Sequence, residues 1–113
     1  MGRCLFCEII AKKVPAAFVY EDDAVIAFKD ISPQAPTHIL IIPKKHIASL
    51  AVAGEDETPL LGKMQNVAAK LGRELGLGQG FRVVTNSGRM AGQTVDHLHY
   101  HLLGGRQMQW PPG

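Results

Sequence analysis

The sequence predicts an α+β domain in which an antiparallel sheet of five strands is covered by one long helix, with a short helix near the N-terminus. Three observations support this fold class. Five short apolar segments are flanked by turn residues, as strands are. One longer segment repeats its apolar residues at the helical period, and most strands follow one another directly along the chain. The 113 residues show no internal repeat or linker, so residues 1–113 are expected to form a single domain.

The first expected elements are a short helix over Phe6–Lys13 and a hairpin of two strands. The helix has to end before Pro15, because a proline disfavours helical geometry in the residue that precedes it. The two strands are Phe18–Tyr20 and Ala24–Phe28, and the acidic segment Glu21–Asp23 between them supplies the turn.

A loop and a buried strand are expected after the hairpin. Asp30–Pro36 contains two prolines in seven residues, which is typical of a loop. His38–Ile42 is almost continuously apolar, as in a buried strand, and Pro43 ends it because proline lacks the N–H group that a sheet requires. Lys44 and Lys45 then open a connection to the long helix, where solvated charge is their expected role.

The long helix is expected to begin with Thr58 as its N-cap and Pro59 in its first turn, a combination that favours a helix start. Gly76 and Gly78 end the helix. Its apolar residues recur at three- and four-residue steps and define the face that packs on the sheet: Leu60, Leu61, Met64, Val67, Ala68, Leu71 and Leu75.

The composition places the chain among ordinary globular domains. Hydrophobic residues make up 46% and charged residues 19%, and the formal net charge is only +2. Such a weak charge gives no reason to expect a nucleic acid or a membrane surface as partner. No apolar run approaches the roughly 20 residues of a membrane-spanning helix, and the first residues lack the apolar stretch of a signal peptide. We therefore expect a cytoplasmic protein.

Three of the five histidines fall in the last of two further expected strands, Phe81–Asn86 and Thr94–Leu103. His97, His99 and His101 alternate with apolar residues, and on a strand this period of two places all three imidazoles on one face. The outer two would lie ~13 Å apart at ~3.3 Å per residue, so one metal ion is not expected to bind all three. A row of imidazoles instead offers a nucleophile and flanking donors to an anion such as phosphate.

Small and polar residues next to this row can form an anion-binding loop. Asn86-Ser87-Gly88 and Gly92-Gln93-Thr94 supply hydroxyl groups, side-chain amides and freely oriented backbone N–H groups. Glycine-rich loops are more often ordinary turns. The pattern alone therefore leaves both interpretations open.

Several segments resemble the histidine triad (HIT) family. His97–Leu103 is similar to the histidine triad motif, in which histidines alternate with apolar residues. Phe28–His38, Ile42–His46 and Gly104–Gly113 resemble the histidine triad nucleotide-binding branch of the family. Together these segments span most of the chain, about residues 5–113.

The resemblance implies a homodimer whose two five-stranded sheets join into ten strands, and a purine nucleoside phosphoramidase activity through a nucleotidyl-histidine intermediate. In the family pattern His99 attacks the α-phosphorus, and the backbone carbonyl of His97 orients it. His101 would donate to a phosphate oxygen, and Thr94 would bind phosphate or the leaving amine. Transferases of the superfamily have glutamine in place of His101, so hydrolysis is expected. His38 would help to arrange the active-site histidines.

The resemblance also assigns nucleotide contacts. Asp30 would accept hydrogen bonds from both ribose hydroxyls. Phe28 and Ile31 would line the base, and Trp110 would reach toward the partner subunit's site. The residues expected at the nucleotide are Phe28, Asp30, Ile31, Asn86, Gly92, Gln93, Thr94, His99, His101 and Trp110. Without the resemblance, Asp30 is a turn cap, Phe28 and Ile31 are core residues, and Trp110 is a tail residue packed for burial.

Cys4 and Cys7 have the spacing of two thiolate ligands, which is half of a zinc site. The resemblance to bacterial members with such a pair implies a structural zinc ion held by Cys4, Cys7, His46 and His97. Many nucleotide-binding members lack the cysteines, so a stabilising role is expected rather than a chemical one. Two free buried thiols and a redox-active pair are the alternatives.

Two further functions stay open at this point. The same histidines can serve the hydrolysis of dinucleoside polyphosphates. Alternatively, the protein is a nucleotide-binding or protein-interaction module with weak catalysis, although the complete triad with Asp30, Asn86 and Thr94 argues against this.

Overall fold

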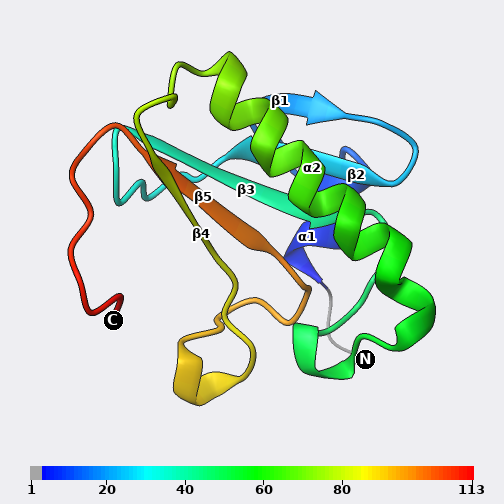
Figure 1. The fold of residues 1–113 in the computed structure, drawn as a ribbon. Coiled ribbons are helices and arrows are strands. Elements are labelled where there is room, and N and C mark those ends of the chain that lie inside the picture. Colours follow the sequence, from blue (N-terminus) through cyan, green and yellow to red (C-terminus); the bar gives the residue numbers. More distant parts are fainter. Residues whose placement is uncertain (1–3) are drawn as a thin grey trace.

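The structure, a computed structural model, describes residues 4–113 and confirms the α+β class. Its five strands form one antiparallel sheet in the order β1-β2-β3-β5-β4 (Figure 1). The helices and strands are α1 (Leu5–Ile10), β1 (Phe18–Glu21), β2 (Val25–Lys29), β3 (Thr37–Pro43), α2 (Thr58–Glu74), β4 (Phe81–Val84) and β5 (Tyr100–Gly104).

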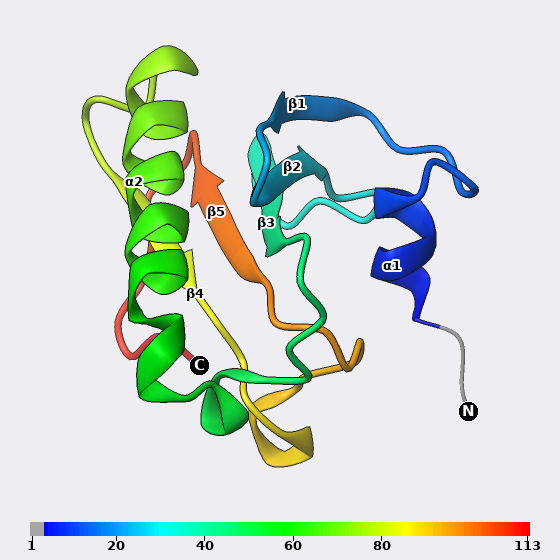
Figure 2. The same cartoon turned by 90° about the vertical axis from the view of Figure 1, so that its right-hand side faces the viewer.

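The two helices cover opposite faces of the sheet, so the domain has three layers (Figure 2). The apolar face of α2 packs on one side through Met64, Val67 and Leu71, which are at most 3% exposed. Phe6 and Ile9 of α1 pack on the other side, within a second apolar cluster. Burying each of these large side chains stabilises the fold by roughly 1.5–3 kcal/mol.

The start of each helix differs from the prediction. Thr58 is the first residue of α2 and not its N-cap, because a 3₁₀ turn over Glu55–Glu57 runs directly into the helix. The Thr58 hydroxyl donates to the carbonyl of Glu55 at 2.7 Å instead of accepting from the first helical turn. The first helix is shorter than expected and ends at Ile10. Its N-cap is Cys4, whose Sγ accepts from the N–H of Cys7 at 3.3 Å.

The predicted last strand is too long, and β4 also ends two residues before the expected Asn86. Strand β5 begins at Tyr100, so residues 94–99 form a connection. The reason lies in β3, which ends at Pro43. Pro43 has no N–H to donate, and its carbonyl accepts instead from the His97 side chain at 2.8 Å. The N–H of Leu98 donates to the Ile47 carbonyl in the loop beyond β3.

The predicted alternation of side chains across the sheet is nevertheless confirmed. Leu98, Tyr100 and Leu102 all belong to the cluster under α2. His97 and His99 contact Phe6 of α1 on the opposite side. Within residues 4–113, every buried side-chain nitrogen or oxygen atom has a hydrogen-bond partner. No helix in this part of the chain is long and apolar enough to cross a membrane.

Candidate active site and cysteine cluster

The five histidines come from three separate parts of the sequence but lie along β3, β5 and the connections next to them. His38 is on β3 and His101 on β5, and these two strands pair directly. His97 and His99 precede β5, and His46 follows β3. In residues 4–113, two groups of side chains bring potential metal ligands together: Asp30, His38 and His101; and Cys4, Cys7, His46 and His97.

His99 is oriented by the backbone of His97. Its Nδ1 lies 2.7 Å from the carbonyl oxygen of His97, and only 5% of the residue is exposed. Because a carbonyl only accepts, Nδ1 carries the proton, and Nε2 of the neutral ring keeps its lone pair. The ring of Phe6 packs edge-on against the imidazole, with 5.1 Å between ring centroids. The structure thus contains the hydrogen bond that the resemblance implied, and its geometry suits a nucleophile at phosphorus.

His38 and His101 form a hydrogen-bonded pair with a defined proton arrangement. The backbone N–H of Gln34 donates to Nδ1 of His38 at 3.0 Å, so the proton of neutral His38 is on Nε2. That Nε2 lies 2.9 Å from Nδ1 of His101, which therefore accepts. Neutral His101 keeps its own proton on Nε2, where it can be donated to an anion.

Burial keeps this pair neutral near pH 7. Burial lowers the pKa of His101 to about 4, and the neighbouring rings of His99 and His38 add to the decrease while Asp30 opposes it. Burial also lowers the pKa of His38, again against the charge of Asp30. The hydrogen bonds from Gln34 to His38 and from His38 to His101 each need an acceptor nitrogen on the ring, so both imidazoles have to be neutral.

Asp30 lies at the edge of this pair, beside residues expected at the base. Its Oδ1 accepts from the N–H of Ser32 at 2.8 Å, and its Oδ2 lies 3.4 Å from Nε2 of His38. The turn-cap alternative for Asp30 is therefore confirmed, although it does not exclude a ribose contact. Phe28 is 4% exposed and packs against Phe6, as a core residue does, whereas Ile31 is 99% exposed and is not a core residue.

The loop before the histidines is held together by hydrogen bonds from one of its own side chains. Gly92 has a left-handed backbone with φ of 90°, which glycine adopts without strain. The buried side chain of Gln93 accepts from the N–H of Gly88 at 2.8 Å and donates to the carbonyl of Ala48 at 2.7 Å. Gln93 therefore holds the loop together, and a nucleotide contact from its side chain would have to replace one of these bonds.

The other expected nucleotide residues lie at or near the surface. Asn86 follows β4 and is half-buried, and Thr94 is exposed in the connection before β5. Trp110 is 81% exposed in the C-terminal tail, so burial within its own chain does not explain it. Lys44 and Lys45 form ion pairs with Glu21 and Glu57, in agreement with the expected role as solvated charge: Lys44 Nζ to Glu21 Oε2 is 2.7 Å, and Lys45 Nζ to Glu57 Oε2 is 2.6 Å.

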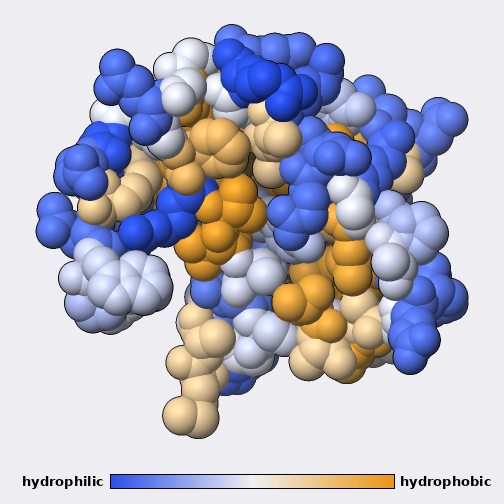
Figure 3. Space-filling view, viewed as in Figure 1, coloured by the Kyte–Doolittle hydropathy of each residue, from blue (hydrophilic) through white to orange (hydrophobic). Residues whose placement is uncertain are grey.

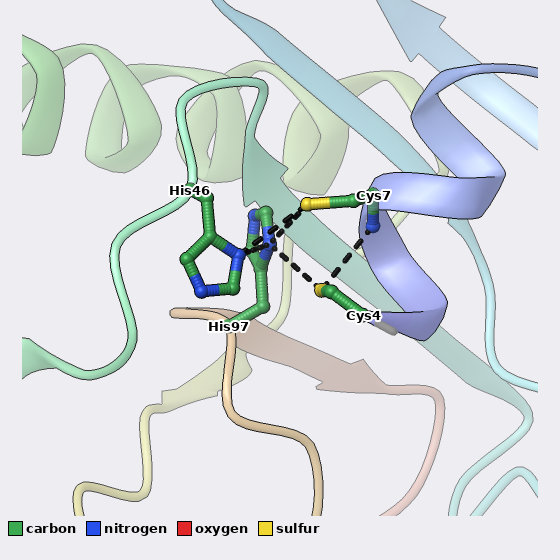
Figure 4. A group of neighbouring side chains, drawn as sticks. All are labelled: Cys4, Cys7, His46 and His97. Atoms are coloured by element: carbon green, nitrogen blue, oxygen red, sulfur yellow. Dashed lines mark hydrogen bonds between the residues drawn. The ribbon is translucent and has the colours of Figure 1, made fainter. Parts of the chain in front are cut away.

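The cysteines lie beside two histidines (Figure 4). Sγ of Cys4 lies 3.4 Å from Nδ1 of His97, and Sγ of Cys7 lies 3.3 Å from Nδ1 of His46. The two Nδ1 atoms are 3.1 Å apart, and Cys7 Sγ is 3.7 Å from His97 Nδ1. Zinc–ligand bonds of about 2.0–2.3 Å in a tetrahedral site place ligand atoms about 3.3–3.8 Å apart. These four residues, which we call the cysteine cluster, therefore fit a zinc ion.

The tautomer of His97 suits the same interpretation, whereas the Cys7 thiol would have to lose a proton to bind a metal. Nε2 of His97 donates to the carbonyl of Pro43 at 2.8 Å, so neutral His97 presents the lone pair of Nδ1 to the sulfur atoms. His97 is fully buried, and burial lowers its pKa, which favours this neutral form. Burial raises the pKa of Cys7 to about 11, and Cys4 adds to the increase. Without a metal the Cys7 thiol stays protonated, and metal binding would release its proton.

Three groups that shape the site were missed by the sequence analysis. Two are backbone groups, the N–H of Gln34 and the carbonyl of Pro43, which carry no sequence signal of their own. The third is Phe6, whose ring contacts both His97 and His99. Its position between the two cysteines was the one signal in the sequence that connects it with this region.

Fold and site define a small α+β domain in which three buried histidines, His38, His97 and His99, are held by hydrogen bonds beside the partly buried His101. A family model for the HIT domain matches residues 11–108. An uncharacterised HIT-like protein of Synechocystis is 50% identical over 109 residues, which is 96% of each chain. The chain belongs to the HIT family.

Solved structures agree with this assignment. A HIT family hydrolase from Legionella pneumophila is 52% identical and has a TM-score of 0.97, with 98% of this chain and 100% of that chain covered. A HIT family hydrolase from Clostridium thermocellum is 48% identical with a TM-score of 0.92, and 96% of each chain is covered. The protein is thus similar in both sequence and fold to hydrolases of the family.

Proposed function

We propose that the protein is a nucleotide hydrolase that cleaves the P–N bond of purine nucleoside phosphoramidates, such as adenosine 5′-phosphoramidate or adenylyl-lysine. The products are a nucleoside monophosphate and an amine. The observation that carries this proposal is the 2.7 Å hydrogen bond from Nδ1 of His99 to the His97 carbonyl, which leaves Nε2 free to attack. The similarity to HIT family hydrolases supports the hydrolytic class.

The proposed reaction has two steps. Nε2 of His99 attacks the α-phosphorus, the P–N bond breaks, and the departing nitrogen takes up a proton and leaves as the amine. Water then attacks the nucleotidyl-histidine, which releases the monophosphate and restores neutral His99. Nε2–H of His101 donates to a phosphate oxygen, where negative charge develops. Thr94, at the start of the connection before His97, would bind the phosphate or the leaving amine.

The nucleoside would lie beside the His38–His101 pair. Asp30 would accept from the ribose hydroxyls, since its Oδ2 has only the 3.4 Å contact with His38 to give up. Ile31 would contact the base with its exposed side chain, over the buried ring of Phe28. Asn86, Gly92, Gln93 and the partner subunit's tail with Trp110 would complete the site.

Removal of the nucleophile tests the activity. His99→Ala should abolish turnover of adenosine 5′-phosphoramidate, and mass spectrometry of the wild-type protein mixed with this substrate should detect adenylylated His99. Asp96→Asn is the matched control, because Asp96 is exposed and forms only a 3.6 Å ion pair with Arg89. Turnover retained by His99→Ala would refute the assignment.

A comparison of substrates separates the proposal from the dinucleoside polyphosphate alternative. The proposal expects a higher kcat/KM for adenosine 5′-phosphoramidate than for diadenosine polyphosphates, in assays of the same preparation. The reverse order would favour the alternative. Tight binding of AMP without turnover of either substrate would favour the nucleotide-binding module.

A structural zinc ion at the cysteine cluster is part of this proposal. When bound, zinc would cross-link α1 to the segments that follow β3 and precede β5, and it would supply no step of the reaction. Protein purified without chelator should contain about one zinc per chain. Cys4→Ser should lower the Tm, and the difference from wild type should vanish when both proteins are measured with chelator. A wild-type preparation that contains far less metal, with an unchanged Tm for Cys4→Ser, would contradict the zinc site.

The proposed homodimer would join two sheets through β4, which is one of the two edge strands. Apolar surface gathers on the face that carries α2 and β4 (Figure 3). Phe81 at the start of β4 is 40% exposed, and a hollow of about 620 Å³ lies between the tail and this end of the strand. In sedimentation experiments, Phe81→Asp should yield monomers. Phe18→Asp on the other edge strand, where Phe18 is 38% exposed, should remain dimeric.

A further inference from the structure

His97 links the cysteine cluster to the candidate nucleophile through three different atoms. Its Nδ1 lies 3.1–3.7 Å from the three other ligand atoms of the cluster. Its Nε2 donates to the Pro43 carbonyl at 2.8 Å, and its backbone oxygen accepts from Nδ1 of His99 at 2.7 Å. His97 is fully buried, so it cannot move without disturbing the other contacts. The side chain of His97 thus contacts the cluster while its backbone carbonyl orients His99, and the buried position leaves the residue little room to move at one end alone.

A second connection runs through Phe6, which lies between the two cysteines on α1. The Phe6 ring packs edge-on against His97 at 5.9 Å and against His99 at 5.1 Å, with an interplanar angle of 90° to the latter. Helix α1 has only six residues, too few to be stable without tertiary contacts. Ligation of Cys4 and Cys7 would hold this helix, and with it the Phe6 ring, against the histidines.

We propose that His97 and Phe6 couple the cysteine cluster to His99, so that a metal ion in the cluster positions the nucleophile. The inference rests on the proposed role of His99 as nucleophile. The metal would take no part in the reaction, and family members without the cysteines would have to orient the histidine by packing alone. His97 and Phe6 are positioning residues, because neither is proposed to touch the reacting atoms.

The coupling makes a specific kinetic prediction. Loss of the metal should lower kcat about tenfold, a typical effect of a lost orienting partner, and should change KM by less than about twofold. The substrate contacts proposed for Asp30 and Ile31 lie on the loop after β2, at the opposite end of the β2–β3 pair from His46. The ring of Phe28, which contacts Phe6, is also packed against Phe18, so binding should change little.

The direct test is NMR of the full-length protein with ¹⁵N-labelled histidine, measured after chelation and after addition of Zn²⁺. With Zn²⁺, the Nδ1–H proton of His99 should give a sharp, slowly exchanging signal. After chelation this signal should broaden or exchange rapidly. His46→Ala should resemble the chelated protein even with Zn²⁺ present, because His46 is an exposed ligand whose loss leaves the core intact. Lys45→Ala is the matched control, and it should behave as wild type.

A pair of variants in α1 tests the second connection. Phe6→Leu should broaden the His99 signal and lower kcat in the zinc-loaded protein. Ile9→Val removes packing from the same helix and the same apolar cluster but leaves the contacts of the Phe6 ring with His97 and His99 in place, so it should change neither the His99 signal nor kcat. Equal effects of the two variants would show that Phe6 acts only through stability.

The outcomes separate the coupling from the proposed function. If Zn²⁺ binds but leaves both kcat and the His99 signal unchanged, the coupling is overturned and the proposed function stands. If no metal binds, the coupling and the proposed structural zinc ion both fail, while the proposed hydrolysis by His99 stands. If the His99 signal responds to Zn²⁺ while no form of the protein turns over a phosphoramidate, the coupling holds and the proposed function fails.

Discussion

Nε2 of His38 lies 2.9 Å from Nδ1 of His101, across the directly paired strands β3 and β5. The contact has a direction, because the N–H of Gln34 already donates to the other nitrogen of His38. The proton of His38 is therefore shared with His101, and the proton of His101 is on its outer nitrogen. A backbone donor in the loop before β3 thus determines which atom of His101 can donate to a ligand.

The first prediction concerns these tautomers. The ¹⁵N shifts of the imidazoles should show neutral His38 and His101 protonated on Nε2 and neutral His99 protonated on Nδ1. The opposite assignment for His99 follows from its contact with the His97 carbonyl, so the protein contains both tautomers within a few residues. If His101 were protonated on Nδ1, the proposed donation to phosphate would be wrong.

The low pKa of His101 predicts a pH dependence of stability. Burial lowers the pKa to about 4, below the ordinary value of about 6.5 in the unfolded chain. Between about pH 4 and pH 6.5 the unfolded state therefore binds more protons than the folded state. The stabilising contribution is fully present above about pH 6.5 and is lost as the pH falls toward 4. Urea unfolding between pH 7 and pH 4, with chelator present, should show this decrease, and His101→Gln should reduce its slope. An equal slope in both proteins would contradict the prediction.

The sheet and the long helix could be predicted because their apolar patterns also decide their packing. The steps of Met64, Val67 and Leu71 define the buried face of α2, and these residues are in the core. The connection over residues 94–99 could not be predicted in the same way. It keeps the alternation of a strand, but Pro43 opposite it has no N–H for the sheet. The N-cap role of Thr58 could not be predicted for a similar reason. Whether a residue caps a helix depends on the backbone before it, and here that backbone is a 3₁₀ turn.

The resemblance supplied the candidate site residues, and within residues 4–113 the structure brings two groups of them together as potential metal ligands: Asp30, His38 and His101; and Cys4, Cys7, His46 and His97. The cysteine cluster assembles from three segments separated by up to 93 positions, which no local pattern reveals. The loop residue Gln93 shows the limit of such reasoning. Its amide was expected to face a ligand, but three backbone groups bind it within the protein. The partners of a polar side chain are a property of the fold.

Asp22 in the β1–β2 turn should stabilise the protein at neutral pH. Burial of its carboxylate disfavours the charged form, but donors from Tyr20, Ala24, Val25 and Lys63 outweigh this and hold its pKa well below the ordinary value. Asp22→Asn should therefore reduce the free energy of unfolding at pH 7 by about 1–2 kcal/mol.

The pH dependence of the stability difference between wild type and Asp22→Asn identifies the cause of that difference. A depressed carboxyl pKa contributes stability above about pH 4, and the contribution is lost as the pH falls further. The difference between wild type and Asp22→Asn should accordingly close below pH 4. Asp23→Asn, in the same turn but exposed, should match wild type throughout. A pH-independent difference would instead indicate a packing effect of the amide.

Two glycines of α2 should respond in opposite ways to alanine. A Cβ atom at Gly62 would meet no atom within 4 Å, so Gly62→Ala should raise the free energy of unfolding by about 0.5–1 kcal/mol through helix propensity. A Cβ atom at Gly72 would lie 2.5 Å from Cε2 of Phe81, so the ring has to move. Gly72→Ala should lower the free energy of unfolding by about 1–2 kcal/mol. Chemical denaturation measures both, and equal gains would show that the Phe81 ring adapts without cost.

Asp30 provides a test of ribose recognition that is independent of the nucleophile. If its carboxylate accepts from the ribose hydroxyls, a 2′,3′-dideoxy substrate should lose about 10- to 100-fold in kcat/KM with wild-type protein, as charged hydrogen bonds of about 1.5–3 kcal/mol imply. With Asp30→Ala the same change of substrate should cost little. Ser32→Ala keeps the backbone N–H that donates to Asp30 and should behave as wild type.

Asp30→Ala should not affect catalysis through His101. The comparison of the two proteins with the ribose and dideoxyribose substrates therefore tests the ribose contact itself. Asp30 raises the pKa of both His38 and His101, so its removal lowers them further and leaves both rings neutral at the pH of the assay. The proton order along the pair is set by Gln34, which the substitution does not change. The loss for Asp30→Ala should therefore depend on the hydroxyls of the substrate. Additive effects of the two changes, with the same loss for ribose and dideoxyribose substrates, would place Asp30 outside the nucleoside site.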